Sequence, residues 1–230
     1  MGSISVSSIL KEGMIVSTKL GTGCAWYNNI VYKVTDNSVY ISLLDDYIRN
    51  LVMPGSTFTV KHTNEFFEYI FEGVVSHIEV DNPAHMVINV NKTEELINTR
   101  VFPRFDINLP AYLKPVWTDL RHFAITTNIC LGGMAFVSRH SFDYGEECEI
   151  NVHLSDSSIV YAKGKIIRKV AKNNHIDYSM QFIEMDEDNN NLLFTHLLRV
   201  EDKNSSLQTN YFNNIKKHFK GPDSSQKAIV

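Results

Sequence analysis

Two arginines, Arg100 and Arg104, stand four residues apart in a stretch that resists helix formation. Side chains at this spacing share one face of a helix, but Pro103 lacks a backbone N–H and disfavours a helical conformation at Phe102. We therefore expect an extended or turned segment that displays both guanidinium groups. Such groups bind phosphate oxygens, bind the O6/N7 edge of guanine in a bidentate way and stack on bases. The chain has seven arginines, so this spacing also arises by chance and needs a second element to support it.

That second element lies about two dozen residues further on, in the sequence TTNICLGGMAF. The stretch predicts a strand that ends in a Gly-Gly turn, although paired glycines are also an ordinary hairpin signal. Asn128 and Cys130 are alternate residues of the strand, so their side chains point to one face. The Asn128 carbonyl accepts hydrogen bonds, the small Cys130 leaves room for a base, and Gly133 lets the backbone approach a ligand closely. These residue types suit a ligand with phosphate groups and guanine bases.

An RxxxR pair followed by (D/N)xSxxG at the start of a small β-barrel resembles the signature of the PilZ domain family. Arg100 and Arg104 complete the first motif. Asn128 and Gly133 match the second motif, which has Cys130 where the family usually has serine. The resemblance implies that these five residues bind the bacterial second messenger cyclic-di-GMP, and it implies no other cofactor.

The likeness to PilZ domains covers residues 96 to about 200, and residues 1–95 resemble the N-terminal β-domain of YcgR-type PilZ proteins, the flagellar brakes. The resemblance implies a cytoplasmic receptor, not an enzyme, that changes its interdomain arrangement on ligand binding. Its implied partner is a protein target such as a component of the flagellar motor or stator. A regulator of exopolysaccharide synthesis, and an adaptor that kept the PilZ fold but lost the ligand, are the alternatives.

The elements that position these residues are predicted to be strands. Period-two alternation and turn residues predict two sets of about six short strands, typical of small barrels. The first set lies in GMIVSTKL, IVYKVTDNSVYISLL, STFTVKH, FFEYIFEGVVSHIEV and HMVINV; the second lies in FDINLPAYLKPVW, RHFAITTNI, GMAFVSR, CEINVHLS, SIVYAKGKIIRKV and HIDYSMQFIEM. We therefore expect an all-β fold of two small β-barrels in tandem. The predicted division is an N-terminal barrel over 1–95, a linker over 96–104, a PilZ barrel with a closing helix over 105–205 and a polar tail over 206–230.

The closing helix is indicated by acidic and asparagine residues that precede an apolar helical face. That predicted face comprises Leu192, Leu193, Phe194, Leu197 and Leu198. The tail is weakly amphipathic from Tyr211 to Phe219, which fits a short helix or no regular structure. Three lysines in this tail, Lys216, Lys217 and Lys220, are interpreted as a solvated face.

Composition excludes several classes of function. The net charge of −4 and the pI of about 6.1 argue against binding the backbone of long nucleic acids. A barrel that binds single-stranded nucleic acid remains a remote alternative, with Phe102, Phe105 and Trp117 as its stacking residues. No apolar window is long enough to predict a transmembrane segment.

Catalysis and metal binding are not predicted either. His122, His140, His153, His175 and His196 lack the HxxxH or HExxH spacing of metal sites. The three cysteines are widely separated, which fits no disulfide framework, and we interpret Cys24 and Cys148 as reduced, buried thiols.

Overall fold

The computed structural model of the protein describes residues 5–21, 23 and 25–219. Cys24 and Lys220 therefore lie outside the described residues. The chain forms two compact units. Unit 1 contains the chain up to Thr99 and again from Lys203, and unit 2 contains Arg100–Asp202.

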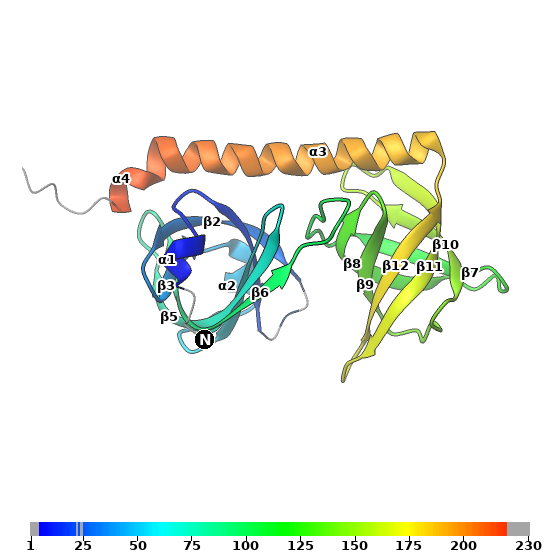
Figure 1. The fold of residues 1–230 in the computed structure, drawn as a ribbon, viewed down its shortest axis with the longest axis horizontal. Helices are drawn as coiled ribbons and strands as arrows, with labels where there is room; N and C mark the ends of the chain where they lie inside the picture. Colours follow the sequence, from blue (N-terminus) through cyan, green and yellow to red (C-terminus); the bar gives the residue numbers. More distant parts are fainter. Residues whose placement is uncertain (1–4, 22, 24, 220–230) are drawn as a thin grey trace, which may run out of the picture. The chain divides into compact units, whose positions relative to one another are not determined.

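Unit 1 is a closed antiparallel barrel of six strands (Figure 1). Its strands are β1 (Ile15–Leu20), β2 (Tyr27–Val34), β3 (Ser38–Ser42), β4 (Thr57–Thr63), β5 (Phe67–Glu79) and β6 (His85–Ile97), and its short helices are α1 (Val6–Ile9) and α2 (Asp45–Arg49). Around the barrel the strands follow the order β1-β2-β3-β6-β5-β4. Alternate residues of β1 and β3 are buried, as the period-two pattern predicts.

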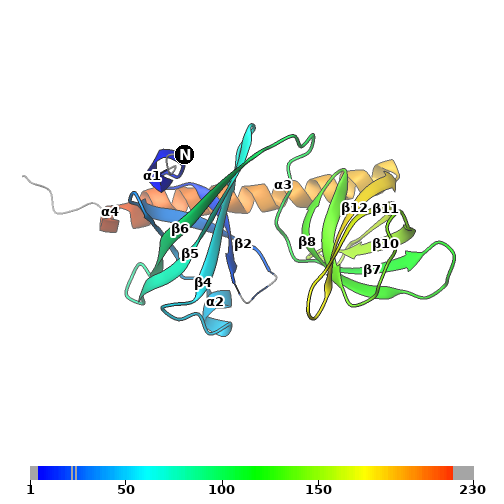
Figure 2. The same cartoon turned by 60° about the horizontal axis from the view of Figure 1, so that its bottom comes forward.

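The short helix α2 was not predicted from the sequence, and it lies at one end of the unit 1 barrel (Figure 2). Its Tyr47 is buried and packs edge-to-face against Phe58 in the barrel core. The Tyr47 hydroxyl lies within hydrogen-bonding distance of the Thr18 hydroxyl, and burial of Tyr47 raises its pKa. The helix thereby supplies a large side chain to the end of the core.

Unit 2 is a second closed antiparallel barrel of six strands. Its strands are β7 (Pro110–Pro115), β8 (His122–Cys130), β9 (Gly133–Ser138), β10 (Glu147–His153), β11 (Ile159–Ala171) and β12 (Ile176–Glu184). Their order, β7-β8-β9-β12-β11-β10, repeats the order in unit 1 when strands are counted from the first of each unit. The expected all-β fold of two tandem barrels is therefore confirmed.

Helix α3 (Glu187–Asn210) begins where the acidic and asparagine residues predict it. The Asp186 carboxylate accepts a hydrogen bond from the Asn189 backbone N–H at 2.8 Å, which satisfies one amide of the first helical turn. Leu193 and Leu197 are buried in the core of unit 2. The predicted apolar face was too wide, because Phe194 and Leu198 are 47% and 44% exposed.

The C-terminal end of the described chain differs most from expectation. Residues from 206 onward continue the helix through Asn210, then form a π-helix over Tyr211–Ile215 and a last helical turn, α4, over Lys216–Phe219. Tyr211 is fully buried in unit 1, and its hydroxyl donates to the Tyr32 carbonyl at 2.8 Å. This segment therefore packs as part of unit 1.

The predicted boundary at residue 95 falls inside β6, which continues to Ile97. Ile97 is the partner of Phe67 on β5, so strand pairing carries the first barrel two residues further. The two compact units divide between Thr99 and Arg100. No helix in the described part of the chain is long and apolar enough to cross a membrane.

Candidate functional site

A β-bulge in β8 decides which way the candidate site residues face. Thr126 pairs with Phe136 of β9, but the next pair is Asn128 with Ala135, so one residue of β8 is extra. Thr126 and Ile129 are both fully buried. Because side chains alternate across a strand, Asn128 and Cys130 on either side of Ile129 lie on the outer face of the barrel.

The segment that carries the arginines is held beside this strand. The Phe105 N–H donates to the Ile129 carbonyl at 2.9 Å, and the Ile129 N–H donates to the Phe105 carbonyl at 3.0 Å. This antiparallel bridge places Arg104 next to Cys130. Phe105 packs on the core, so Arg104 lies on the outer face with Cys130.

A second contact fixes the same segment to the hairpin. The Phe102 ring lies over Gly132, where a Cβ atom would come within 2.9 Å of the ring atom Cδ2. Arg100 and Arg104 flank this anchor and are both exposed to solvent. The segment from Arg100 to Arg104 has no regular secondary structure, as Pro103 predicts.

Cys130 and Gly133 close the hairpin. The Cys130 thiol donates to the Gly133 carbonyl at 3.4 Å, and only 7% of the residue is exposed. Cys130 is nevertheless not part of the core cluster of unit 2. A Cβ atom at Gly133 would lie 2.2 Å from the Met180 carbonyl oxygen of β12, so glycine is required there for the close approach of two strands.

The pairing of β9 with β12, and of β12 with β11, brings further residues to this outer face. One row crosses four strands through Asn128, Ala135, Ser179 and Arg168; the next row crosses them through Cys130, Gly133, Gln181 and Lys165. Ala135 and Ser179 are short, so the middle of the first row is low between the amide of Asn128 at one end and the cationic Arg168 at the other.

A comparison with models of protein families matches residues 98–199 to the PilZ domain. Residues 98–199 form a PilZ domain. The match begins two residues before unit 2 and includes the arginine pair, the β8–β9 hairpin and the first half of α3.

Comparison with solved structures gives several matches that span both units. The structure of Bacillus subtilis Inhibitor of motility (MotI/DgrA) shares 13% identity, with 84% of this chain and 99% of that chain covered and a TM-score of 0.43. The crystal structure of YcgR in complex with c-di-GMP from Escherichia coli shares 11% identity, with 84% and 86% covered and a TM-score of 0.44. The K. pneumonia MrkH–c-di-GMP complex shares 10% identity, with 82% and 89% covered and a TM-score of 0.43. A sequence comparison with curated proteins gave no match.

Sequence reasoning missed Arg168 and Lys165 as neighbours of the candidate site. A register shift between Ile166 and Arg168 in the pairing of β11 with β12 turns Arg168 outward, opposite Ser179. Strict alternation along KGKIIRKV would place Lys165 and Ile167 on one face and Arg168 on the other. The sequence therefore gives no sign that Arg168 faces outward. The cationic end of this face of the PilZ domain, formed by Lys165 and Arg168, can therefore be recognised only from the strand register.

The remaining cysteines and histidines of the PilZ domain form no reactive cluster among the described residues. Cys148 is fully buried, as predicted, and burial raises the pKa of its thiol to about 12. His122 and His140 stack with ring centroids 3.4 Å apart, but no three potential metal ligands gather anywhere in the described parts of the chain. Of the candidate stacking residues for nucleic acid, Phe105 packs on the core and Trp117 is 75% exposed.

Proposed function

We propose that the PilZ domain binds cyclic-di-GMP on the outer face of β8, β9 and β12. The observation that carries the proposal is the bridge between Phe105 and Ile129, which places Arg104 beside Cys130 on that face. Residues of two motifs that are about two dozen residues apart in the sequence therefore lie on one continuous surface. The face combines guanidinium groups, an amide and short side chains, and these match the phosphates and guanine edges of the ligand.

Each predicted residue has a distinct part in this proposal. Arg100 and Arg104 bind phosphate oxygens or a guanine edge, and such charged contacts contribute about 1.5–3 kcal/mol each. Asn128 accepts hydrogen bonds from guanine N–H groups. Cys130 leaves room for the base, and its thiol, a weak donor, exchanges its hydrogen bond to the Gly133 carbonyl for one to the ligand on binding, while Gly133 keeps the hairpin close to β12.

The proposed output is a change in the arrangement of the two units. Arg100 and Arg104 begin unit 2 immediately after the boundary at Thr99, in a stretch without regular structure. A ligand that ties both side chains to the β8–β9 hairpin orders this stretch and restricts how the units are connected. We propose that the protein is a cytoplasmic receptor, without enzymatic activity of its own, that regulates a flagellar motor component in this way.

Isothermal titration calorimetry with cyclic-di-GMP tests the binding proposal directly. Arg100→Ala and Arg104→Ala are each expected to weaken binding at least tenfold, about 1.4 kcal/mol, because each removes a charged contact to a dianion. Arg139→Ala is the matched control, since Arg139 is an exposed arginine of the same barrel outside the proposed face. Unchanged affinity in both variants would refute the site.

Small-angle scattering at saturating ligand tests the output. The profiles with and without cyclic-di-GMP are expected to differ in wild-type protein and to coincide in Arg104→Ala. Identical wild-type profiles would contradict the switch while leaving the binding site intact. Co-purification of motor proteins or of exopolysaccharide synthesis proteins, with and without ligand, distinguishes the two candidate targets.

A further inference from the structure

A second surface of the PilZ domain lies on strands that the proposed ligand site does not use. Its central row crosses four strands through Phe123 of β8, Tyr112 of β7, Asn151 of β10 and Tyr161 of β11. Adjacent residues of these strands, such as Ala111 and Val152, are buried in the core, so the row faces outward. We call this row, with Lys114, Glu149 and Arg121, the β7–β10 face.

Three large aromatic side chains of the β7–β10 face are exposed to solvent. Phe123 is 53% exposed, Tyr161 is 52% exposed and Tyr112 is 40% exposed. The rings of Tyr112 and Phe123 meet edge-to-face with centroids 5.8 Å apart, so they form one continuous patch. Contiguous aromatic patches on soluble domains are typical of protein interfaces, where tyrosine, phenylalanine and arginine are enriched.

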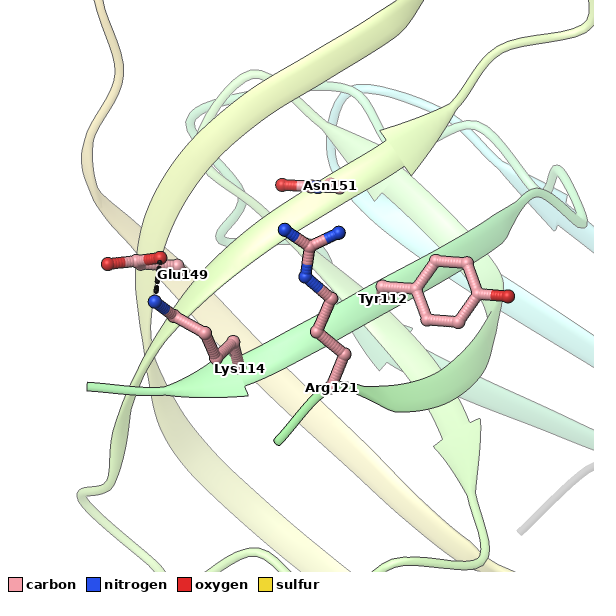
Figure 3. A pocket seen from close by; sticks show the side chains of 5 residues that line it. All are labelled: Tyr112, Lys114, Arg121, Glu149 and Asn151. Carbon is pink, nitrogen blue, oxygen red and sulfur yellow. Dashed lines mark ion pairs between the residues drawn. The ribbon is translucent and has the colours of Figure 1, made fainter. Parts of the chain in front are cut away.

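Beside the aromatic row lies a shallow, open pocket. It is lined by Tyr112, Lys114, Arg121, Glu149 and Asn151. Figure 3 shows the Arg121 guanidinium between the Tyr112 ring and the Lys114–Glu149 ion pair, whose charged atoms are 2.8 Å apart.

Arg121 is the cation of this pocket whose charge is not balanced. Lys114 is paired with Glu149, whereas Arg121 makes no ion pair or hydrogen bond with any residue in the described ranges. An exposed guanidinium held beside an aromatic ring is well suited to bind a carboxylate through two parallel hydrogen bonds. Arg121 is therefore the group of this pocket that is available to a negative charge on a partner.

The size and charge of the face exclude other occupants. The pocket is a shallow, open hollow and not an enclosed cavity of the roughly 300–1,000 Å³ typical of small-molecule sites. Glu149 and Glu147 lie among the lysines of this face, which does not suit an anionic membrane or a nucleic acid backbone. The barrel is closed, so β7 and β10 have no free edge to which a partner strand could add.

We propose that the β7–β10 face is the docking surface for an acidic segment of another protein. One Asp or Glu carboxylate of that segment binds Arg121, and apolar side chains beside it pack on Tyr112 and Phe123. This geometry follows the usual energetics of interfaces, in which a few aromatic and arginine residues provide most of the binding energy. The inference stands on contacts within unit 2 and does not depend on cyclic-di-GMP binding.

Photo-crosslinking in cells tests this proposal with the full chain. Phe123 is replaced by p-benzoylphenylalanine, and the crosslinked peptide is sequenced by mass spectrometry. We expect a peptide from a different protein with Asp or Glu next to apolar residues, and at least a tenfold loss of crosslink when Arg121→Glu is added. Reversing the charge of the identified acidic residue to Lys is expected to restore the crosslink to the Arg121→Glu protein.

Matched variants make each outcome decisive. Arg139→Glu introduces the same charge change on an exposed arginine outside the face, and it is expected to leave the crosslink unchanged. Melting temperature and cyclic-di-GMP affinity are expected to be unaltered by Arg121→Glu, which separates a failure here from a failure of the ligand proposal. A crosslink to a second copy of this chain, a crosslink insensitive to Arg121→Glu, or no crosslink at all would overturn the proposal.

Discussion

The substitution Cys130→Ser tests how far the departure from the PilZ motif weakens ligand binding. Cys130 lies on the outer face beside Arg104, and its thiol donates a hydrogen bond to the Gly133 carbonyl at 3.4 Å. A hydroxyl is a shorter and stronger donor than a thiol. The expected gain in binding free energy is part of one neutral hydrogen bond to the ligand, about 0.5–1.5 kcal/mol, which corresponds to a roughly two- to twelvefold lower dissociation constant.

Two measurements on the same variant decide whether this reasoning holds. Calorimetry reports the affinity for cyclic-di-GMP, and thermal unfolding reports whether the hydroxyl is tolerated. We expect tighter binding and a melting temperature close to that of the wild type, because Cys130 lies outside the core cluster. Cys130→Val, which keeps the bulk without a donor, is the matched control and is expected to weaken binding or leave it unchanged.

The opposite pattern would show that the side chain faces the barrel interior. A buried, poorly paired hydroxyl costs stability without adding a ligand contact. A Cys130→Ser protein with a lower melting temperature and no gain in affinity would therefore remove Cys130 from the site. Loss of wild-type binding altogether would instead indicate that the arginine contacts do not outweigh the missing serine.

Three further substitutions test the fold around the two units. Gly13→Ala is expected to destabilise unit 1 by about 1–3 kcal/mol in denaturant unfolding, because its φ is +82° and a Cβ atom would lie 2.5 Å from the Phe212 ring; an unchanged midpoint would contradict this packing. Gly133→Ala is expected to lower the melting temperature of unit 2, since its Cβ would lie 2.2 Å from the Met180 carbonyl oxygen, and tolerance would indicate that β9 and β12 are not so close. Burial of His140 and the stacked histidine beside it lower the pKa of His140 below 6.5. Protonation of His140 therefore destabilises the folded protein, so the free energy of unfolding is highest above about pH 6.5 and falls as the pH drops through the folded-state pKa. His140→Gln should flatten that fall in unfolding titrations at pH 7.5 and pH 5, and an equally steep fall would exclude His140 as its source.

Several strands of the barrels could be predicted because apolar and polar residues alternate within their own sequence, as they do in β1 and β3. The orientation of the site could not. Strict alternation from the buried Ala124 and Thr126 would turn Asn128 and Cys130 into the core. The bulge between Thr126 and Asn128 reverses this, and its position depends on pairing with β9, a contact that no local pattern reports.

The C-terminal helical segment was hard to predict for a related reason. Short amphipathic stretches are marginal helices on their own, and most of their stability comes from the surface on which they pack. Here that surface is the outer face of β2, where Ile30 and Tyr32 form a small cluster with Tyr211. An outward-facing tyrosine and isoleucine on a strand do not by themselves indicate which later segment covers them.

The burial of Tyr211 in unit 1 also affects the order in which the protein is made. The first 99 residues contain all six strands of that barrel, but residues 203–219, which cover Ile30 and Tyr32, leave the ribosome only after the whole PilZ domain. During synthesis, the outer face of β2 in unit 1 therefore stays uncovered until residues 203–219 are made. Unit 2 already has every residue it needs to fold at that point. A chain that stops at Asp202 would retain the complete PilZ domain and leave Ile30 and Tyr32 of its first barrel exposed.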